Sequence, residues 1–147
     1  MSATHTGTPA ESAVPNTASG AAVSHPSAPI PVQGPGVGTG VRTVLGETGL
    51  SVFPLILGGS EFGRTLGQTR SHAVLDRYTE LGGDIVQTAD SCAGGRSEHI
   101  IGQWMRGRGL RDSIVLATRV GVHADNPGLG SVNLVRSVVS SLTRLGN

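Results

Sequence analysis

The sequence predicts an α/β fold whose strands pair in parallel. From residue 41 onwards, short apolar runs alternate with longer segments, each of about 10–15 residues, that carry apolar side chains at helical spacing. Glycines follow these longer segments, as is typical of helix ends. Such an order requires right-handed crossovers between parallel strands. Two architectures therefore fit the pattern, a doubly wound sheet and a (β/α)₈ barrel.

A hairpin is predicted where this pattern starts. Residues 41–53 read VRTVLGETGLSVF, with two β-prone runs on either side of the turn segment GETG at 46–49. The continuous apolar run PLILGG at 54–59 follows. We expect it to form a strand that is buried on both faces.

The first helix is predicted to begin near Thr69 or Ser71, because either side chain can cap a helix N-terminus. The pair Gly82-Gly83 should end it. The next strand is predicted at 84–89, with the sequence DIVQTA. The expected apolar face of the helix consists of Val74, Leu75, Tyr78 and Leu81.

A second helix is expected to start at Ser97 and to stop at Gly107 and Gly109. Its apolar face consists of Ile100, Ile101, Trp104 and Met105. A third buried strand is predicted at 114–120, IVLATRV, and Ser131 should open a third helix that Gly146 closes. The apolar face of that helix consists of Val135, Val138, Val139, Leu142 and Leu145.

The composition limits the classes of function. The 147 residues carry a net charge of +1, which argues against a general role on nucleic acids or membrane surfaces. All eleven basic residues are Arg, and Cys92 is the single cysteine, so no internal disulfide can form. We find neither a secretory signal nor an apolar run of about 20 residues. A cytoplasmic protein is expected.

Residues 1–40 have a different composition from the remainder. Six of the eight prolines lie there among Ser, Thr, Ala and Gly, and Glu11 is the one charged side chain. So little apolar surface cannot offset an ordering entropy of about 1–2 kcal/mol per residue. We therefore expect a disordered tail over 1–40 and a folded domain over 41–147.

The segment after the first strand separates the two architectures. It reads LGGSEFG, which does not match the dinucleotide fingerprint G-x-G-x-x-G. The doubly wound nucleotide-binding fold is thereby disfavoured.

Five segments together resemble the N-terminal part of the aldo/keto reductase family. They are LGETGLSVFPLILGGSEFG, AVLDRYTELGGDIVQTAD, GGRSEHIIGQWMRGR, RDSIVLATRVG and LVRSVVSSLTRLG. The resemblance runs from about residue 42 to the last residue. It implies an N-terminal hairpin followed by three βα units of an incomplete TIM (β/α)₈ barrel. It also implies an oxidoreductase that reduces small aldehydes and ketones with NADP(H).

The resemblance also identifies site positions. The family's Asp at the end of the second strand corresponds to Gln87, its Tyr proton donor to Cys92, and its Lys to Arg119. The position of its His lies beyond Asn147. Gly59, Ser60 and Gln87 correspond to positions that pass close to the cofactor.

These substitutions weaken the proton relay. Gln87 cannot pair with a cation, and Arg119 cannot exchange a proton near neutral pH. The sulfur of a cysteine at position 92 lies roughly 3–4 Å nearer to its own backbone than a Tyr hydroxyl does. A carbonyl held against a nicotinamide would be out of its range. The chain alone is therefore expected to be an inactive or truncated member.

Three alternatives remain open because a complete barrel needs about 250 residues. The chain could be a marginally folded fragment, it could pair with a second chain that completes the barrel, or it could self-associate. In function, it could be a non-catalytic nucleotide-binding or regulatory subunit, or a thiol redox sensor that uses Cys92 with Arg119 nearby.

Two weaker site hypotheses concern the same region. Cys92, Asp90 and His123 could meet at the end of the sheet and bind a metal. The segment GGR at 94–96 precedes a helix and could bind an anion, but the segment is short and common, which favours a plain turn.

Overall fold

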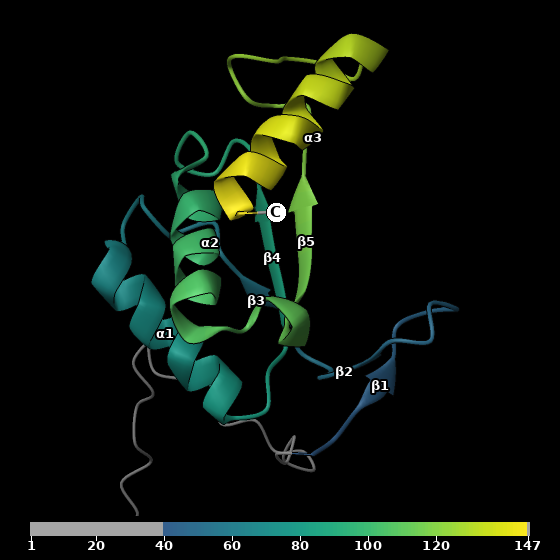
Figure 1. Cartoon of the computed structure of the whole chain (residues 1–147), viewed down its shortest axis with the longest axis vertical. Coiled ribbons are helices and arrows are strands. Elements are labelled where there is room, and N and C mark those ends of the chain that lie inside the picture. Colours follow the sequence, from purple (N-terminus) through teal and green to yellow (C-terminus); the bar gives the residue numbers. More distant parts are fainter. Residues whose placement is uncertain (1–39, 147) are drawn as a thin grey trace, which may run out of the picture. The chain divides into compact units, whose positions relative to one another are not determined.

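The computed structural model describes residues 40–146 (Figure 1). The tail predicted for 1–40 lies outside the described residues, except for Gly40. The elements in chain order are β1 (Thr43–Val44), β2 (Ser51–Val52), β3 (Leu57–Gly58), α1 (Gln68–Glu80), β4 (Ile85–Ala89), α2 (Arg96–Arg108), the 3₁₀ helix η1 (Arg111–Ser113), β5 (Val115–Arg119) and α3 (Ser131–Leu145).

The predicted hairpin is confirmed. Strands β1 and β2 pair antiparallel, and the Leu45 amide donates to the Leu50 carbonyl at 2.8 Å across the turn. Asp84 holds the hairpin against the start of β4. Its carboxylate accepts from Arg42 at 2.5 Å and from the Phe53 amide at 2.8 Å.

The predicted parallel pairing is also confirmed, in a three-stranded sheet with the order β3-β4-β5. Burial on both faces is confirmed only for the central strand β4. The same prediction for 54–59 and 114–120 is wrong, because Leu55 and Ile56 are more than half exposed and β5 alternates between half-buried and exposed positions. Within residues 40–146, β3 and β5 are the outer strands and each has one neighbour.

The predicted helix caps are wrong. The N-cap positions are Gly67, Gly95 and Gly130, and none makes a side-chain cap hydrogen bond. Thr69, Ser71, Ser97 and Ser131 instead lie inside the helices. The reason is visible at Ser97, which is fully buried. Its hydroxyl donates to the Gly59 carbonyl at 2.7 Å and lies 2.8 Å from the Thr88 hydroxyl, so it joins α2 to the sheet.

The helix C-termini follow the prediction more closely. Gly82 with φ 93°, Gly109 with φ 64° and Gly146 with φ 83° adopt the left-handed conformation just after α1, α2 and α3. Glycine is favoured there because it has no Cβ to clash in that conformation. Gly107, however, lies within α2 and does not stop it.

The core lies between the sheet and helices α1 and α2, which lie side by side in Figure 1. The predicted face of α2 is confirmed, since its four apolar side chains are at most 3% exposed. On α1, Leu75 is buried and Tyr78 is half-buried. Val74 in the helix and Leu81 at its C-cap are about 40% exposed, which contradicts their place in the predicted face.

Helix α3 is buried mainly along a different face from the one predicted, and of the predicted face only Leu145 is buried. The buried residues of α3 are Ser137, Ser141 and Leu145. At Gly102 of α2, an added Cβ would lie 2.5 Å from the Arg144 carbonyl oxygen, so only glycine permits this approach. Within the described chain nothing packs on the rest of the predicted face. Four of its five apolar residues are therefore 41–62% exposed: Val135, Val138, Val139 and Leu142.

Candidate functional site

The ends of β4 and β5 bring the predicted site residues to one edge of the sheet. Ala89 and Arg119 are register partners at the last positions of the two strands, and the Asp90 amide donates to the Arg119 carbonyl at 2.8 Å. Cys92 lies one turn further on, with its amide donating to the Ala89 carbonyl at 3.1 Å. The carboxyl ends of parallel strands are where α/β proteins bind ligands.

A cavity of about 180 Å³ lies at this edge. Cys92 and Arg119 both line it, so the structure brings together two of the three predicted catalytic positions. Gln87 does not line it. Its side chain is half-buried in the middle of β4, where its neighbours across the sheet are Gly58 and Ala117. The lining residues are Ala89, Asp90, Ser91, Cys92, Arg119, Val120 and Val122.

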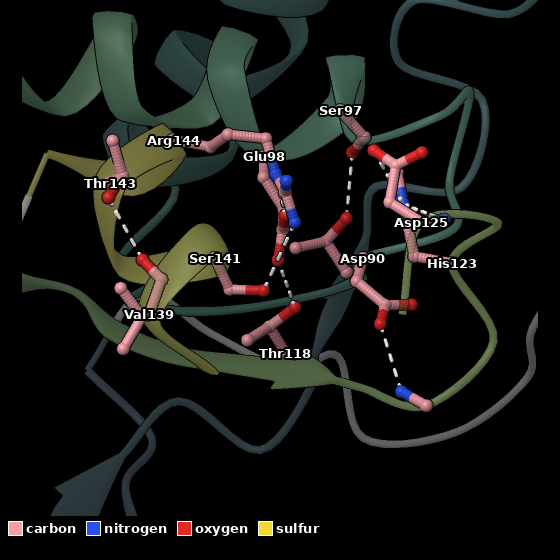
Figure 2. A network of polar contacts seen from close by, with 12 residues as sticks. Asp90, Ser97, Glu98, Thr118, His123, Asp125, Val139, Ser141, Thr143 and Arg144 are labelled. Atoms are coloured by element: carbon pink, nitrogen blue, oxygen red, sulfur yellow. Dashed lines mark hydrogen bonds and ion pairs between the residues drawn. The ribbon is translucent and has the colours of Figure 1, made fainter. Parts of the chain in front are cut away.

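Asp90 is a cavity residue to which sequence reasoning gave only a weak role in metal binding. Its side chain is 1% exposed, and its Oδ2 accepts from the Gly121 amide at 2.9 Å (Figure 2). Its Oδ1 is buried and has no hydrogen-bond partner within residues 40–146. A buried carboxylate oxygen normally accepts a hydrogen bond, so this orphan oxygen marks a functional candidate. The signal in the sequence was an acidic residue directly after a buried strand.

One cationic side chain, that of Arg119, shares the cavity lining with Cys92. Arg119 is exposed, and its guanidinium has no partner within the described chain. The pKa of Arg64 is raised, chiefly by its hydrogen bond with Glu61 and to the smallest extent by the charge of Cys92. Cys92 itself is half-buried and free.

Tyr78, the single tyrosine of the sequence, is held at the opposite end of β4. Its hydroxyl lies 2.6 Å from the Leu55 carbonyl oxygen and 2.9 Å from that of Ile85, and it accepts from the Ile85 amide at 3.3 Å. Burial raises the pKa of this phenol. At about 3.3 Å per strand residue, the start of β4 is roughly 16 Å from Asp90. Tyr78 therefore cannot replace Cys92 as a proton donor at the cavity.

The positions predicted to contact a cofactor differ in their surroundings. A Cβ on Gly59 would lie 3.1–3.2 Å from Ser97, Ile101 and Phe62, so the glycine at this position allows β3 to pack against α2. Ser60 is exposed, and a Cβ on Gly58, which directly precedes the predicted positions, would meet nothing within 4 Å. Gly58 and Ser60 therefore lie on open surface that a ligand could approach.

A buried ion pair behind the site was not predicted. Glu98 of α2 is fully buried and accepts from Arg144 Nε at 2.6 Å and from Thr118 Oγ1 at 2.6 Å (Figure 2). It thus joins α2, α3 and β5. A glutamate beside the apolar positions of α2 was the signal in the sequence, but nothing there identified Arg144 as its partner.

The two weaker site hypotheses gain no support. Within residues 40–146, no group of three His, Cys, Asp or Glu side chains is placed to hold a metal ion, which argues against the site of Cys92, Asp90 and His123. Before α2, the amides of residues 94–97 donate to backbone carbonyls of residues 91–93. They are therefore not free to bind an anion, and the plain turn is the better explanation.

A larger cavity of about 450 Å³ lies away from the strand ends, between the start of α1 and the exposed side of α2. Its lining includes Arg64, Arg96 and His99. Of the residues considered for chemistry in the sequence, Arg96 alone lines it, and the catalytic positions Gln87, Cys92 and Arg119 do not, so we place the candidate site at the smaller cavity. None of the helices in residues 40–146 is long and apolar enough to cross a membrane.

Comparison with known proteins identifies the family of this parallel α/β chain. The model of the aldo/keto reductase family matches residues 54–147. Norsolorinic acid reductase stcV of Emericella nidulans is 41% identical over 78 residues, which are 48% of this chain and 20% of that protein. An uncharacterized 11.2 kDa protein in the crtE 3′ region of Pseudescherichia vulneris is 40% identical over 85 residues, 52% of this chain and 82% of that protein.

A solved structure supports the same assignment. The aldo-keto reductase AKR11C1 from Bacillus halodurans, in its holo form, superposes with a TM-score of 0.61 and 29% identity over 72% of this chain and 36% of that one. The chain belongs to the aldo/keto reductase family, as the five sequence motifs predicted. It spans about a third of the length of that solved relative and a fifth of the reductase from Emericella nidulans.

Proposed function

We propose that this member of an NAD(P)H-linked oxidoreductase family does not, by itself, reduce carbonyl compounds. The observation that supports the proposal is the position of Tyr78, whose hydroxyl is bonded to backbone groups at the start of β4. The family's proton-donor position at the other end of the strand is held by Cys92. The remaining side chains of the cavity are Asp90, Arg119 and small or apolar groups.

None of these groups supplies the required proton. A general acid must come within about 2.6–3.2 Å of the substrate oxygen and must release its proton near the working pH. Arg119 keeps its proton throughout that range. Asp90 is buried at the base of the loop, where its Oδ2 accepts a hydrogen bond from the Gly121 amide. The side chain of Cys92 is too short to bring its sulfur to the position of a phenol oxygen.

The test is a comparison of two purified chains. The wild-type chain and the triple variant Gln87→Asp, Cys92→Tyr, Arg119→Lys are incubated with NADPH and a series of small aldehydes, and oxidation of NADPH is followed by absorbance. We expect no turnover above a blank from the wild-type chain. Turnover by the wild-type chain at an ordinary enzymatic rate, about 1–10³ s⁻¹, would overturn the proposal. Turnover confined to the triple variant would show that the substitutions are the cause.

Cofactor binding by the chain alone is also proposed to be weak. Gly58, Ser60 and Gln87 offer an open surface and neutral hydrogen-bonding groups, which suit a ribose or an amide but provide no charge for a phosphate. These residues fit only part of a nicotinamide nucleotide. A fluorescence titration with NADPH is expected to show no saturable quenching in the micromolar range.

A second candidate function is that of one part of a barrel assembled from two chains. The observation in its favour is the exposed apolar face of α3, together with the outer strands β3 and β5. An apolar stripe this wide on a helix is usually covered by a sheet or core rather than by water. A barrel completed in this way would accept a small carbonyl substrate.

Co-expression tests this second candidate. The probe is the part of the Bacillus halodurans reductase that this chain does not match, expressed with the full chain. A complex of the two on a sizing column, abolished by Val135→Asp, would support it. Separate elution of both chains would count against it.

A further inference from the structure

We propose that the cavity between the start of α1 and the exposed side of α2 binds a small organic phosphate, a phosphomonoester. This binding goes beyond the proposed function, because it involves neither hydride transfer nor the cavity at the ends of β4 and β5. The volume of about 450 Å³ lies within the range of roughly 300–1,000 Å³ that is usual for small-molecule sites. The lining residues that the described chain contributes include no Asp and no Glu. The polar side chains among them are Arg64, Gln68, Arg96 and His99.

Arg96 is an arginine of this lining that no carboxylate neutralises. Its guanidinium has no hydrogen-bond or ion-pair partner within residues 40–146. Its stem lies against the loop before α1, since a Cβ on Gly63 would be 2.6–3.0 Å from Arg96 Cβ, Cγ and Cδ. Gly63 has φ 80°, and its amide donates to the Leu66 carbonyl at 2.7 Å, so the loop is itself held in place. The contact restricts the guanidinium before a ligand arrives, which reduces the entropy lost on binding.

The N-terminus of α1 also opens onto the cavity, because its N-cap Gly67 and its first residue Gln68 line it. Gly67 has no side chain that could cap the helix. The first amide bonded to a carbonyl is that of Ser71, which donates to the Gly67 carbonyl at 3.0 Å. The amides of residues 68–70 have no acceptor within the part of the chain that the structure describes. They are therefore available to an anion at the positive end of the helix, unlike the first amides of α2.

The number and direction of the donors favour a phosphate over a carboxylate. Arg96 can donate two parallel hydrogen bonds to adjacent oxygens. His99 lies three residues further along α2 and projects from the same side, so its ring N–H is a second donor there. The amides of α1 approach from another element. A phosphomonoester has three terminal oxygens and a charge of about −1.5 to −2 at pH 7, so it can accept from both helices at once.

Arg64 is the second arginine of the lining, and it is paired with Glu61. The Glu61 carboxylate also accepts from the Thr65 hydroxyl at 2.7 Å. The side chains of Arg64 and Glu61 are 65% and 39% exposed, so their ion pair is weak. A dianion in the cavity would compete with Glu61 for the guanidinium. Neutralising Glu61 should therefore strengthen binding, which is an effect that a merely structural role of this loop would not produce.

Calorimetric titration of the full chain with phenyl phosphate at pH 7.5 tests the proposal. We expect saturable binding at one site, with a Kd of about 1 mM or below. Phenyl sulfate has a similar shape but a single negative charge, and it should bind at least about tenfold more weakly. Inorganic phosphate lacks the organic group that the cavity would enclose and should also bind more weakly. No saturable binding of phenyl phosphate, or equal affinity for all three compounds, would overturn the proposal.

Variants then assign the binding to the cavity. Arg96→Gln should raise the Kd of phenyl phosphate at least about tenfold, whereas Glu61→Gln should lower it about threefold. The matched control is Arg136→Gln, an exposed arginine on α3 outside the lining, which removes the same charge and should change the Kd by less than about twofold. Circular dichroism checks that each variant folds, and Glu61→Gln provides the test if Arg96→Gln does not. Equal weakening by Arg96→Gln and Arg136→Gln would show attraction by net charge alone and overturn the proposal.

The position of the ligand is tested by amide chemical shifts in the ¹⁵N-labelled chain. The signals of Gln68 and Thr69 should move during the phenyl phosphate titration and saturate with the calorimetric Kd. Shifts confined to Ser91 and Cys92 would place the ligand at the ends of β4 and β5 and overturn the proposal. The measurement needs no NADPH and no turnover, so its outcome is separate from that of the carbonyl-reduction test.

Discussion

Helices α2 and α3 have the same kind of sequence pattern and opposite surroundings. In both, apolar residues recur at helical spacing on one face. The face of α2 is at most 3% exposed, whereas four of the five residues on the face of α3 are 41–62% exposed. Helix α2 lies between α1 and α3 and against β4, whereas α3 contacts α2 and buries only Ser137, Ser141 and Leu145. Amphipathic periodicity therefore identifies a face that requires cover, but it does not show what covers it.

The largest difference between the two helices should appear on truncation of Trp104. This side chain is fully buried in α2, and its indole donates to Asp76 at 2.7 Å. Trp104→Ala should lower the free energy of unfolding by about 3–5 kcal/mol, measured by urea denaturation. Val139→Ala on α3, where the side chain is 56% exposed, is the control and should cost less than about 0.5 kcal/mol. Equal costs would remove the distinction between the helices.

The buried ion pair between the helices should give the next largest effect. Glu98→Gln removes the charge that Arg144 pairs with, and we expect a loss of about 1–3 kcal/mol. Glu80→Gln is the matched control, because Glu80 and its partner Arg77 are more than 60% exposed. That change should cost less than about 1 kcal/mol. A cost for Glu98→Gln no greater than that of the control would mean that the pair does not fasten α3 to α2.

The contact between α1 and α2 should depend on pH. Hydrogen bonds from Arg108 and then from Trp104 lower the pKa of Asp76 in the folded chain. A lowered folded pKa contributes stability above the unfolded value of about 3.9, and this contribution is lost as the pH falls through the folded value. Urea midpoints at pH 7 and pH 3 should therefore differ less in Asp76→Asn than in the wild type. If the midpoints of the variant differed by as much as those of the wild type, other carboxyl groups would be the cause of the lower stability at pH 3.

The smallest effect is expected on the exposed face of α3. Val135→Ser changes a side chain that is 62% exposed and should alter the free energy of unfolding by no more than about 0.5 kcal/mol. Leu145→Ser, in the same helix but 3% exposed, should cost several times more in the same urea experiment. A large cost at Val135 would show that its face is covered in solution, which would sharpen the case for a partner.

Much of the fold could be predicted from local patterns. The hairpin turn, the parallel order of strands, the face of α2 and the glycines that end the helices each depend on a few neighbouring residues. The helix caps could not be predicted in the same way. Ser97 has the right side chain for a cap, yet its hydroxyl bonds to Gly59, 38 positions away in the sequence. Burial of β3 and β5 likewise depends on neighbours that the local pattern does not specify.

The site was predictable in part because family motifs fixed the positions of Cys92 and Arg119, which line one cavity. Gln87 matched the motif equally well but lies outside that lining. Its role at a cofactor remains a prediction. The orphan oxygen of Asp90 depends on the path of the chain from β5 into the following loop. No spacing in the sequence encodes which of its two oxygens is bonded.

The close packing of α3 against α2 depends on the absence of a side chain at Gly102. A methyl group there would meet the carbonyl oxygens of Arg144 and Leu145 within 2.8 Å. The last turn of α3 would have to move outward, which would withdraw Arg144 from Glu98 and Leu145 from the core in one displacement. Any larger residue at position 102 would thus separate α3 from α2 without displacing α1 or α2.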